Sequence, residues 1–271
     1  MDSGSGITGG TNQLLDALPA AQSQRLMRSL TPVFLGLKTV LFEPGRTTDS
    51  VDFPLNCVVS LVTPLHDGAI VEVATVGNEG IVGVPLVLGG SLAVRAISSV
   101  AGWAERMDAS AFLYEVANNA ALRELVDDYL QALFGQISQA AACNRLHSTE
   151  ERLSRWLLMS HDRVGTDEFA ITHEFLGQML GSRRATVTLA AGVLQAAGLI
   201  RYHRGQVTIV DRAGLESVAC ECYGVIKSEL DGVLDRADDR QHPASGRELT
   251  GRGHSRLGAE VEADLGPTIE S

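Results

Sequence analysis

Arginine and hydroxyl side chains gather at the start of one predicted helix whose remaining residues are mostly apolar. The cluster comprises Ser182, Arg183, Arg184, Thr186 and Thr188. An arginine guanidinium can form two parallel hydrogen bonds with guanine in the major groove of DNA, and Ser or Thr hydroxyls can contact bases or phosphates. Residues 182–212 hold five arginines and one aspartate, although the whole chain has a formal net charge of −11. Because charges act over roughly 8–10 Å at ordinary salt concentrations, this local excess of cations predicts binding to a polyanion.

Two closely crossing helices are predicted to position this cluster. Gly177 is small enough for a second helix to pass close by, and Gly181 can adopt the left-handed conformation that ends the first helix. Val187 follows six residues later, with Ala190 and Leu194 on the same face. This spacing is typical of a helix-turn-helix motif. In such a motif the first exposed turns of the second helix enter the major groove.

The residues on either side of the motif favour the same interpretation. Thr172 is predicted to cap the first helix, whose N-terminal amides could bind a phosphate. After the second helix, the stretch RYHRGQVTI predicts a β-hairpin with His203 and Arg204 at its tip. Such a hairpin would form a wing along the DNA backbone. The alternative is that the charged residues form a solvated face on a purely structural pair of helices.

The N-terminal half of the chain has a different character. From about residue 37 to 107, short β-branched runs alternate with Gly, Pro and Asp-Gly, which predicts a small β-sandwich or roll. The period then becomes helical, and a long helix is predicted from about 120 to 147. Its apolar stripe predicts a homodimer contact through Leu122, Leu125, Val126, Tyr129, Leu133, Ile137 and Ala141. The alternative is that this stripe packs only on its own β-roll.

Together these motifs resemble the Crp–Fnr superfamily of bacterial transcription regulators over roughly residues 12–230. The resemblance rests on NQLLDALP, VLFEPG, the glycine-punctuated roll, the long helix, and the stretch from ITHEFLGQMLGSRRATV to LQAAGLIRYHRGQVTIVD. It implies an α+β fold with a cyclic-nucleotide-binding-type β-roll over 12–118, a dimerisation helix over 119–147, and a C-terminal winged helix-turn-helix domain over 148–232. Residues 1–11 are expected to be a flexible leader. Residues 233–271 are expected to be a disordered tail, because they are polar and poor in apolar side chains.

The resemblance also implies a function and a set of contact residues. It implies a cytoplasmic homodimer that binds double-stranded DNA at two half-sites, with RNA polymerase and an unknown small-molecule effector as further candidate partners. The positions of the family's DNA contacts hold Thr172, Glu174, Ser182, Arg183, Arg184, Thr186 and Leu189. The predicted DNA-binding set adds Thr188, His203 and Arg204. Leu189 and Ala185 replace residues that are often charged in the family, so the target sequence cannot be borrowed from other members.

Binding of cyclic AMP in the family's usual manner is not expected. Members that bind cyclic nucleotides use a Gly-Glu pair for the ribose and an Arg-Ser or Arg-Thr pair for the cyclic phosphate. The corresponding positions here are Gly83-Val84 and Gly90-Ser91. A valine cannot accept a hydrogen bond from the ribose, and the phosphate charge would lack its arginine, although Arg95 lies close by in the sequence. Gly83, Val84, Ser91 and Arg95 therefore define the candidate pocket for an unknown effector.

The sequence favours neither a metal centre, nor an enzyme, nor a membrane protein. Cys220 and Cys222 are closer together than the usual zinc-binding pair, and Cys57 and Cys143 are isolated. The cysteines are therefore not expected to complete a set of four metal ligands, and no cofactor is expected. The chain has no HExxH, P-loop or nucleophile-elbow motif, and no apolar run long enough to span a membrane. Three alternatives remain open: a sensory module whose winged domain contacts protein, a true cyclic-nucleotide receptor, and a nucleotide-regulated enzyme subunit.

Overall fold

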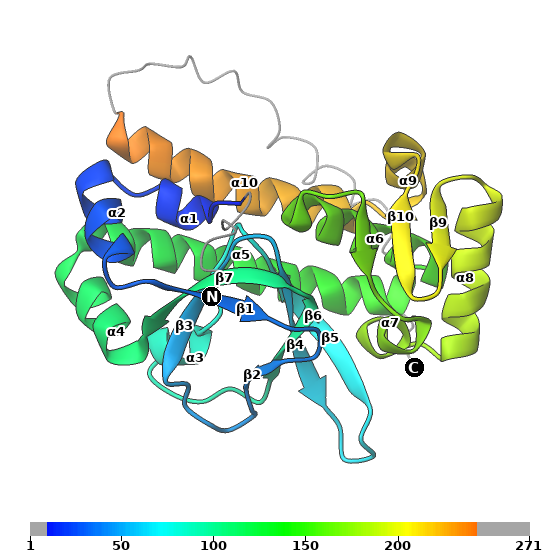
Figure 1. The fold of residues 1–271 in the computed structure, drawn as a ribbon, viewed down its shortest axis with the longest axis horizontal. Helices are drawn as coiled ribbons and strands as arrows, with labels where there is room; N and C mark the ends of the chain where they lie inside the picture. Colours follow the sequence, from blue (N-terminus) through cyan, green and yellow to red (C-terminus); the bar gives the residue numbers. More distant parts are fainter. Residues whose placement is uncertain (1–9, 243–271) are drawn as a thin grey trace, which may run out of the picture.

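A computed structural model describes residues 10–242, which form a β-roll, a long helix and a winged helical domain (Figure 1). The described chain begins with two short helices, α1 (Gln13–Asp16) and α2 (Ala20–Met27). The Asn12 side chain caps α1, and its amide donates hydrogen bonds to the carbonyl oxygens of Pro54 and Gly80. These bonds tie the start of the described chain to the roll. Of the predicted leader, residues 1–9 lie outside the described residues.

The β-roll consists of two antiparallel sheets. One has the strand order β1–β7–β3 and the other β2–β6–β4–β5. The strands are β1 (Thr31–Leu35), β2 (Val40–Phe42), β3 (Ser50–Pro54), β4 (Val58–Pro64), β5 (Ile70–Val76), β6 (Arg95–Val100) and β7 (Gly102–Asp108). A short helix, α3 (Val84–Val87), lies between β5 and β6. The predicted roll is confirmed, although its first strand begins earlier than the β-branched pattern indicated.

The long helix packs on the β-roll through the same apolar residues that were predicted from the sequence to form the dimer contact. After α4 (Ala109–Asn118), α5 extends over Ala120–Leu146. Leu122, Leu125, Val126, Tyr129 and Leu133 all belong to the core cluster of the roll and are at most 5% exposed. The prediction that these five residues contact a second subunit is therefore wrong. Their apolar surface is already buried within one chain, which is the alternative that the sequence left open.

The C-terminal domain combines several helices of the chain's second half with a small sheet. It contains α6 (Thr149–Val164), β8 (Glu168–Ala170), α7 (His173–Met179), α8 (Arg184–Ala196), β9 (Ile200–His203), β10 (Gln206–Ile209) and α9 (Arg212–Val218), followed by the last helix, α10 (Cys222–Gln241). The sheet has the order β8–β10–β9. Ser148 begins α6 with a reciprocal capping box to Glu151, which satisfies two amide groups at the helix start.

The winged domain packs against its own β-roll. Val58 and Val62 on β4, with Ile97 and Val100 on β6, belong to the same core cluster as the residues of the winged domain. Their strand neighbours Val59 and Leu61 belong to the core of the roll instead. Because side chains alternate between the faces of a strand, the four-stranded sheet has the roll's core on one face and the winged domain on the other.

The last helix, α10 (Cys222–Gln241), runs back along α5 (Figure 1). Val233 and Ala237 are buried in the roll's core cluster, and Arg240 forms an ion pair with Asp128 of α5 at 2.8 Å. The predicted start of a disordered tail at residue 233 is therefore wrong, because apolar and ionic contacts hold this segment in a helix. Residues 243–271 lie outside the described residues. Among the helices within 10–242, none combines the length and hydropathy needed to cross a bilayer.

Candidate nucleic-acid interface

The two helices of the predicted helix-turn-helix motif are α7 and α8, and two glycines bring them together. A Cβ atom on Gly177 would lie 2.8 Å from the carbonyl oxygen of Ser182, so only glycine fits this crossing. Gly181 ends the first helix with a φ of +57°, the left-handed conformation that glycine adopts at little cost. The Thr172 hydroxyl accepts a hydrogen bond from the Phe175 amide and caps α7. These predicted roles of Gly177, Gly181 and Thr172 in the motif's architecture are confirmed.

Helix α8 has one buried face and one exposed face. Val187, Ala190 and Leu194 are buried in the core of the winged domain, as the apolar spacing predicted. The opposite face exposes Arg183, Arg184, Ala185, Thr186 and Leu189 at the start of the helix. Leu189 on this face is 71% exposed, so its side chain is accessible to a partner group such as a thymine methyl.

The cations of this face have no partner within the described part of the chain. Across residues 10–242, no hydrogen bond or ion pair engages the side chain of Arg183, Arg184 or Arg204. Elsewhere in the same range, the exposed residues Arg25 and Arg123 pair with nearby carboxylates, whereas Arg28 and Arg46 do not. The guanidinium groups of α8 and of the wing tip are therefore available to an external anion.

Besides the Thr172 hydroxyl, which caps α7, two further predicted contact hydroxyls are engaged inside the domain. The Ser182 hydroxyl accepts a hydrogen bond from Arg152 Nη2 at 2.7 Å and donates one to the Leu180 carbonyl oxygen. The Thr188 hydroxyl donates to the Arg184 carbonyl oxygen and lies 3.0 Å from His173 Nδ1. Either hydroxyl would have to exchange an internal partner to contact DNA. Thr186 and Glu174, by contrast, are not engaged through their side chains by any such bond within the described residues.

Strands β9 and β10 form the predicted wing. Its two-residue turn holds Arg204 at a φ of +49° and Gly205 at +80°, the backbone twist that suits a tight hairpin. His203 and Arg204 are exposed at the tip. Close to the turn, the Tyr202 hydroxyl donates to the Ile171 carbonyl oxygen at 2.7 Å, and the Ile171 amide donates to the Gly205 carbonyl oxygen at 2.8 Å. The wing is therefore anchored directly before α7, beside the recognition face.

His173 links the wing to both helices of the motif. Its ring stacks on Tyr202 with the centroids 3.9 Å apart, and its Nδ1 contacts Thr188 of α8. Partial burial and the positive charge of Arg184 lower the pKa of His173, which favours the neutral form of the ring. A neutral ring can pack against its apolar neighbours without adding a charge to the base of the motif.

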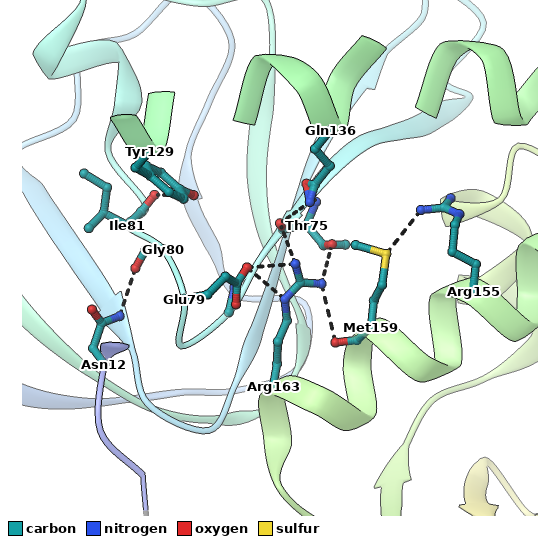
Figure 2. A network of polar contacts seen from close by, with 11 residues as sticks. Asn12, Thr75, Glu79, Gly80, Ile81, Tyr129, Gln136, Arg155, Met159 and Arg163 are labelled. Carbon is teal, nitrogen blue, oxygen red and sulfur yellow. Dashed lines mark hydrogen bonds and ion pairs between the residues drawn. The ribbon is translucent and has the colours of Figure 1, made fainter. Parts of the chain in front are cut away.

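A buried network connects the winged domain to the roll and to α5 (Figure 2). Arg163 of α6 forms an ion pair with Glu79 at 2.7 Å, and its Nη1 donates to the Thr75 hydroxyl at 2.7 Å. Gln136 of α5 accepts a hydrogen bond from the Thr75 amide and donates one to the Thr75 carbonyl oxygen. A Cβ atom on Gly77 would collide with the Arg163 side chain, which lies against this turn.

A second buried contact between the winged domain and the β-roll involves a carboxyl group. Trp156 Nε1 of α6 donates to Glu72 Oε2 of β5 at 3.2 Å, and the Ser60 hydroxyl donates to the same oxygen. Burial raises the pKa of Glu72 from its ordinary value of 4.5 to about 7, against the opposing effect of these hydrogen bonds and of Arg155 and Arg163. The sequence gives no sign of this pairing, because it joins a strand and a helix whose residues are 84 positions apart.

Three of the four candidate effector residues have another role in the structure. Gly83 adopts a φ of +143° before α3, and Val84 is buried in the core of the roll. Arg95 donates a hydrogen bond to Glu43 at 2.8 Å, so its charge is already compensated. Ser91 is exposed. Whether these four residues line an effector pocket stays a prediction.

Comparison with known proteins agrees with this arrangement. Residues 151–218 match the model of the Crp-like helix-turn-helix domain family. Among solved structures, FixK2 from Bradyrhizobium japonicum superposes with a TM-score of 0.61 at 15% sequence identity, covering 70% of this chain and 98% of that chain. A crp/fnr family regulator from Eubacterium rectale gives a TM-score of 0.57 at 18% identity, over 76% of this chain and 96% of that chain.

A third similar structure comes from a thermophile. TTHB099, a CRP family transcriptional regulator from Thermus thermophilus, gives a TM-score of 0.56 at 19% identity, over 69% of this chain and 96% of that chain. No curated protein matches the sequence. Identities this low establish a shared fold, and the helix-turn-helix match adds the motif that carries the exposed arginines.

Proposed function

We propose that this chain, which has the fold and the helix-turn-helix domain of the Crp–Fnr transcription regulators, binds double-stranded operator DNA as a homodimer. The observation that carries the proposal is the recognition face of α8, where Arg183 and Arg184 have no partner among the described residues. The exposed first turns of such a helix fit the major groove, and arginine is the side chain best suited to guanine. The two α8 helices of a dimer would contact half-sites about one helical turn, roughly 34 Å, apart.

The wing supports the same mode of binding. Arg204 is held at the tip of a tight hairpin, and hydrogen bonds from the turn end of this hairpin to Ile171 anchor it just before α7. The wing lies beside the recognition helix, so its tip would face the DNA backbone next to the groove that α8 occupies. A cation at the tip is therefore better placed to contact a phosphate than a base. Base contacts through α8 and a backbone contact through the wing would together fix the orientation of the domain on DNA.

The experiment that tests this proposal compares two double variants. Purified protein first selects bound fragments from the source genome, and the best fragment is then titrated at two salt concentrations. Arg183→Ala with Arg184→Ala is expected to weaken specific binding by ~1–3 kcal/mol for each base that an arginine no longer reads. The matched control is Arg28→Ala with Arg46→Ala, which removes two exposed arginines of the N-terminal half and changes the net charge equally.

The outcome separates a DNA-binding domain from a protein-binding one. If no fragment is enriched and the two double variants bind DNA equally weakly, then the winged domain has another partner. If the α8 variant alone loses binding to a palindromic fragment, the regulator proposal stands and the neighbouring genes indicate what is regulated. RNA polymerase would then be the next partner to test, by transcription from that fragment.

The proposed dimer uses a face of α5 that the chain leaves largely exposed, although Leu130 at its start is partly buried against the roll. Leu130, Phe134, Ile137 and Ala141 follow one another in steps of four, three and four residues, the spacing of a coiled-coil seam. Phe134 is 71% exposed and Ile137 36% exposed. Of the residues first predicted for the dimer, this proposal keeps Ile137 and Ala141 and adds Leu130 and Phe134 from the same helix.

Sedimentation analysis tests this seam. Phe134→Glu is expected to shift the protein from dimer to monomer, because a carboxylate would be buried opposite its own copy in the seam. Tyr114→Glu, on a similarly exposed aromatic residue of α4, is the control and should leave the mass unchanged. A wild-type protein that sediments as a monomer at micromolar concentration would remove the dimer from the proposal and leave the DNA contact standing.

Cyclic AMP and cyclic GMP are not proposed as effectors. The side chain of Val84 is buried in the core and offers no acceptor, and Arg95 already pairs with Glu43. Isothermal titration with either nucleotide is expected to give no saturable heat. A saturable signal that Arg95→Gln abolishes would instead identify a true cyclic-nucleotide receptor with an unusual phosphate contact.

A further inference from the structure

Three cysteines and one histidine, separated by up to 79 residues in the sequence, converge between α5 and the start of α10. We define the Cys/His cluster as Cys143, His147, Cys220 and Cys222. The potential ligand atoms of these four side chains all lie within 4.8 Å of one another. The three cysteines are buried, and His147 is partly buried. The sequence did not predict this grouping, in which His147 adds a fourth potential ligand to the three cysteines.

The distances within the Cys/His cluster fit a single tetrahedral metal ion. Cys143 Sγ lies 3.6 Å from Cys220 Sγ, and Cys222 Sγ lies 3.5 Å from His147 Nδ1. Around a zinc ion with Zn–S bonds of about 2.3 Å, tetrahedral geometry puts two sulfur atoms about 3.8 Å apart. A disulfide would need a sulfur–sulfur distance of about 2.05 Å. It would also leave the third thiol and the histidine without a role.

The surroundings orient the ligands as they do in metal sites. His147 Nδ1 faces Cys222, while its Nε2 lies 3.2 Å from the Glu221 carboxylate. A carboxylate on the far nitrogen fixes the tautomer that leaves the near nitrogen free to bind a metal. Gln139 Nε2 donates a hydrogen bond to Cys222 Sγ at 3.1 Å, which would stabilise a thiolate at that position.

Two buried arginines can balance the charge of an occupied site. Three thiolates, a neutral imidazole and a divalent ion carry a net charge of −1. The positive charge of Arg155 acts on Cys143, and that of Arg152 interacts with both Cys143 and Cys220. The Nε atoms of Arg152 and Arg155 are buried and have no hydrogen-bond partner within the described residues. A site of net negative charge beside them would offset the cost of burying these two cations.

We propose that the Cys/His cluster binds one zinc ion through Cys143 Sγ, Cys220 Sγ, Cys222 Sγ and His147 Nδ1. Binding releases the thiol protons to solvent and forms three Zn–S bonds and one Zn–N bond. Four protein ligands leave no open position, so the site is structural. It joins the C-terminal end of α5 to the connection between α9 and α10, and Ser148 begins α6 directly after His147. The ion would thus fix the winged domain to the long helix.

Metal analysis of the full chain tests the proposal. Protein purified without chelators under reducing conditions and loaded with Zn²⁺ is expected to hold one zinc per chain after desalting. Cys143→Ser and Cys222→Ser should each lose the stoichiometric zinc. Cys57→Ala removes a buried cysteine outside the cluster and should keep it. Cobalt substituted for zinc in the wild type is expected to show the visible absorption bands of tetrahedral Co²⁺ with thiolate ligands, a readout that does not depend on any variant folding.

A variant that weakens zinc binding without removing a ligand distinguishes a metal site from a cluster of buried cysteines that binds no metal. Glu221→Gln should weaken zinc affinity by about 10–100-fold, the usual effect of removing the carboxylate behind a ligating histidine. Glu229→Gln, on an exposed residue of α10, should leave the affinity unchanged. The proposal is overturned if wild-type protein retains no zinc and gives no cobalt spectrum. It is also overturned if Cys143 and Cys220 are found as a disulfide, or if the protein carries iron and sulfide.

Discussion

The winged domain carries two sets of arginines with opposite surroundings. The inner arginines are Arg152, Arg155 and Arg163, which are 7%, 7% and 5% exposed. The outer arginines are Arg183, Arg184 and Arg204, which are exposed or nearly so. Inner arginines face the roll, α5 and the Cys/His cluster, and outer arginines face away from the chain. Both sets lie in the same domain, between residues 152 and 204.

The difference shows how burial divides structural cations from functional ones. A buried cation is costly unless a carboxylate and hydrogen-bond acceptors surround it, and Arg163 has Glu79 together with both oxygens of Thr75. An exposed cation costs little without a partner, because water solvates it. A binding surface can therefore keep its outer arginines unpaired. Because Arg28 and Arg46 also lack partners among the described residues, it is the grouping of the outer arginines on α8 and the wing that points to DNA.

The largest effect is expected from the best-paired inner arginine. Arg163→Met should lower the free energy of unfolding by about 3–5 kcal/mol, because it leaves the Glu79 carboxylate buried without its counter-ion. Glu79 is only 10% exposed and one of its oxygens already lacks a hydrogen bond within the described residues. Urea unfolding measures the loss. The double variant Arg163→Met with Glu79→Leu should recover most of it, and a loss below about 1 kcal/mol for the single variant would contradict this account.

A smaller effect on the free energy of unfolding is expected from the titration of Glu72, the buried carboxyl group near the inner arginines. The pKa of Glu72 is raised from 4.5 to about 7, chiefly by burial. A group with a higher pKa in the folded chain binds its proton more tightly when folded. The contribution of Glu72 is therefore fully present below pH 4.5 and is lost as the pH rises through about 7. The free energy of unfolding should fall by about 2–3 kcal/mol between about pH 5 and pH 8 from this group alone.

Glu72→Gln tests that slope. Its amide keeps an oxygen that can accept from Trp156 and Ser60, and it does not titrate. Denaturant unfolding over the range from about pH 5 to pH 8 should therefore show a flatter pH profile for this variant than for the wild type. Glu168→Gln, on an exposed residue of β8, is the control and should reproduce the wild-type profile. An unchanged slope in Glu72→Gln would mean that Glu72 is ionised throughout this range.

Local signals in the sequence predict most of the fold. Gly177, Gly181 and the spacing to Val187 are confined to one helical hairpin, and the structure confirms the hairpin because short-range steric constraints decide it. The β-roll is predictable for a similar reason, since β-branched runs between turn residues suit strands. Each of these features depends on residues that are close together in the chain.

Features that depend on distant residues are predicted wrongly or missed. The stripe from Leu122 to Leu133 suggests a dimer contact because an amphipathic helix does not reveal which surface covers it, and here the roll and α10 do so. Cys143 is isolated in the sequence, and it meets Cys222 only because α10 folds back along α5, a contact that no periodicity predicts. A cysteine four residues before a histidine at a helix end is the one local signal that points toward the Cys/His cluster.

The smallest effect, and the finest test of the outer set, concerns the wing. Arg204→Asn removes one charge at a position with positive φ, where asparagine is well tolerated. If Arg204 contacts a phosphate, the variant should weaken binding to specific and non-specific DNA by a similar factor and reduce the slope of log affinity against log salt by about 1 per subunit. Fluorescence anisotropy over a salt series measures this slope, with Arg46→Gln of the roll as the control. A change in sequence preference with an unchanged slope would instead make Arg204 a base-reading residue. The wing would then read bases, as Arg183 and Arg184 are proposed to do, and none of the three outer arginines would contact only the DNA phosphates.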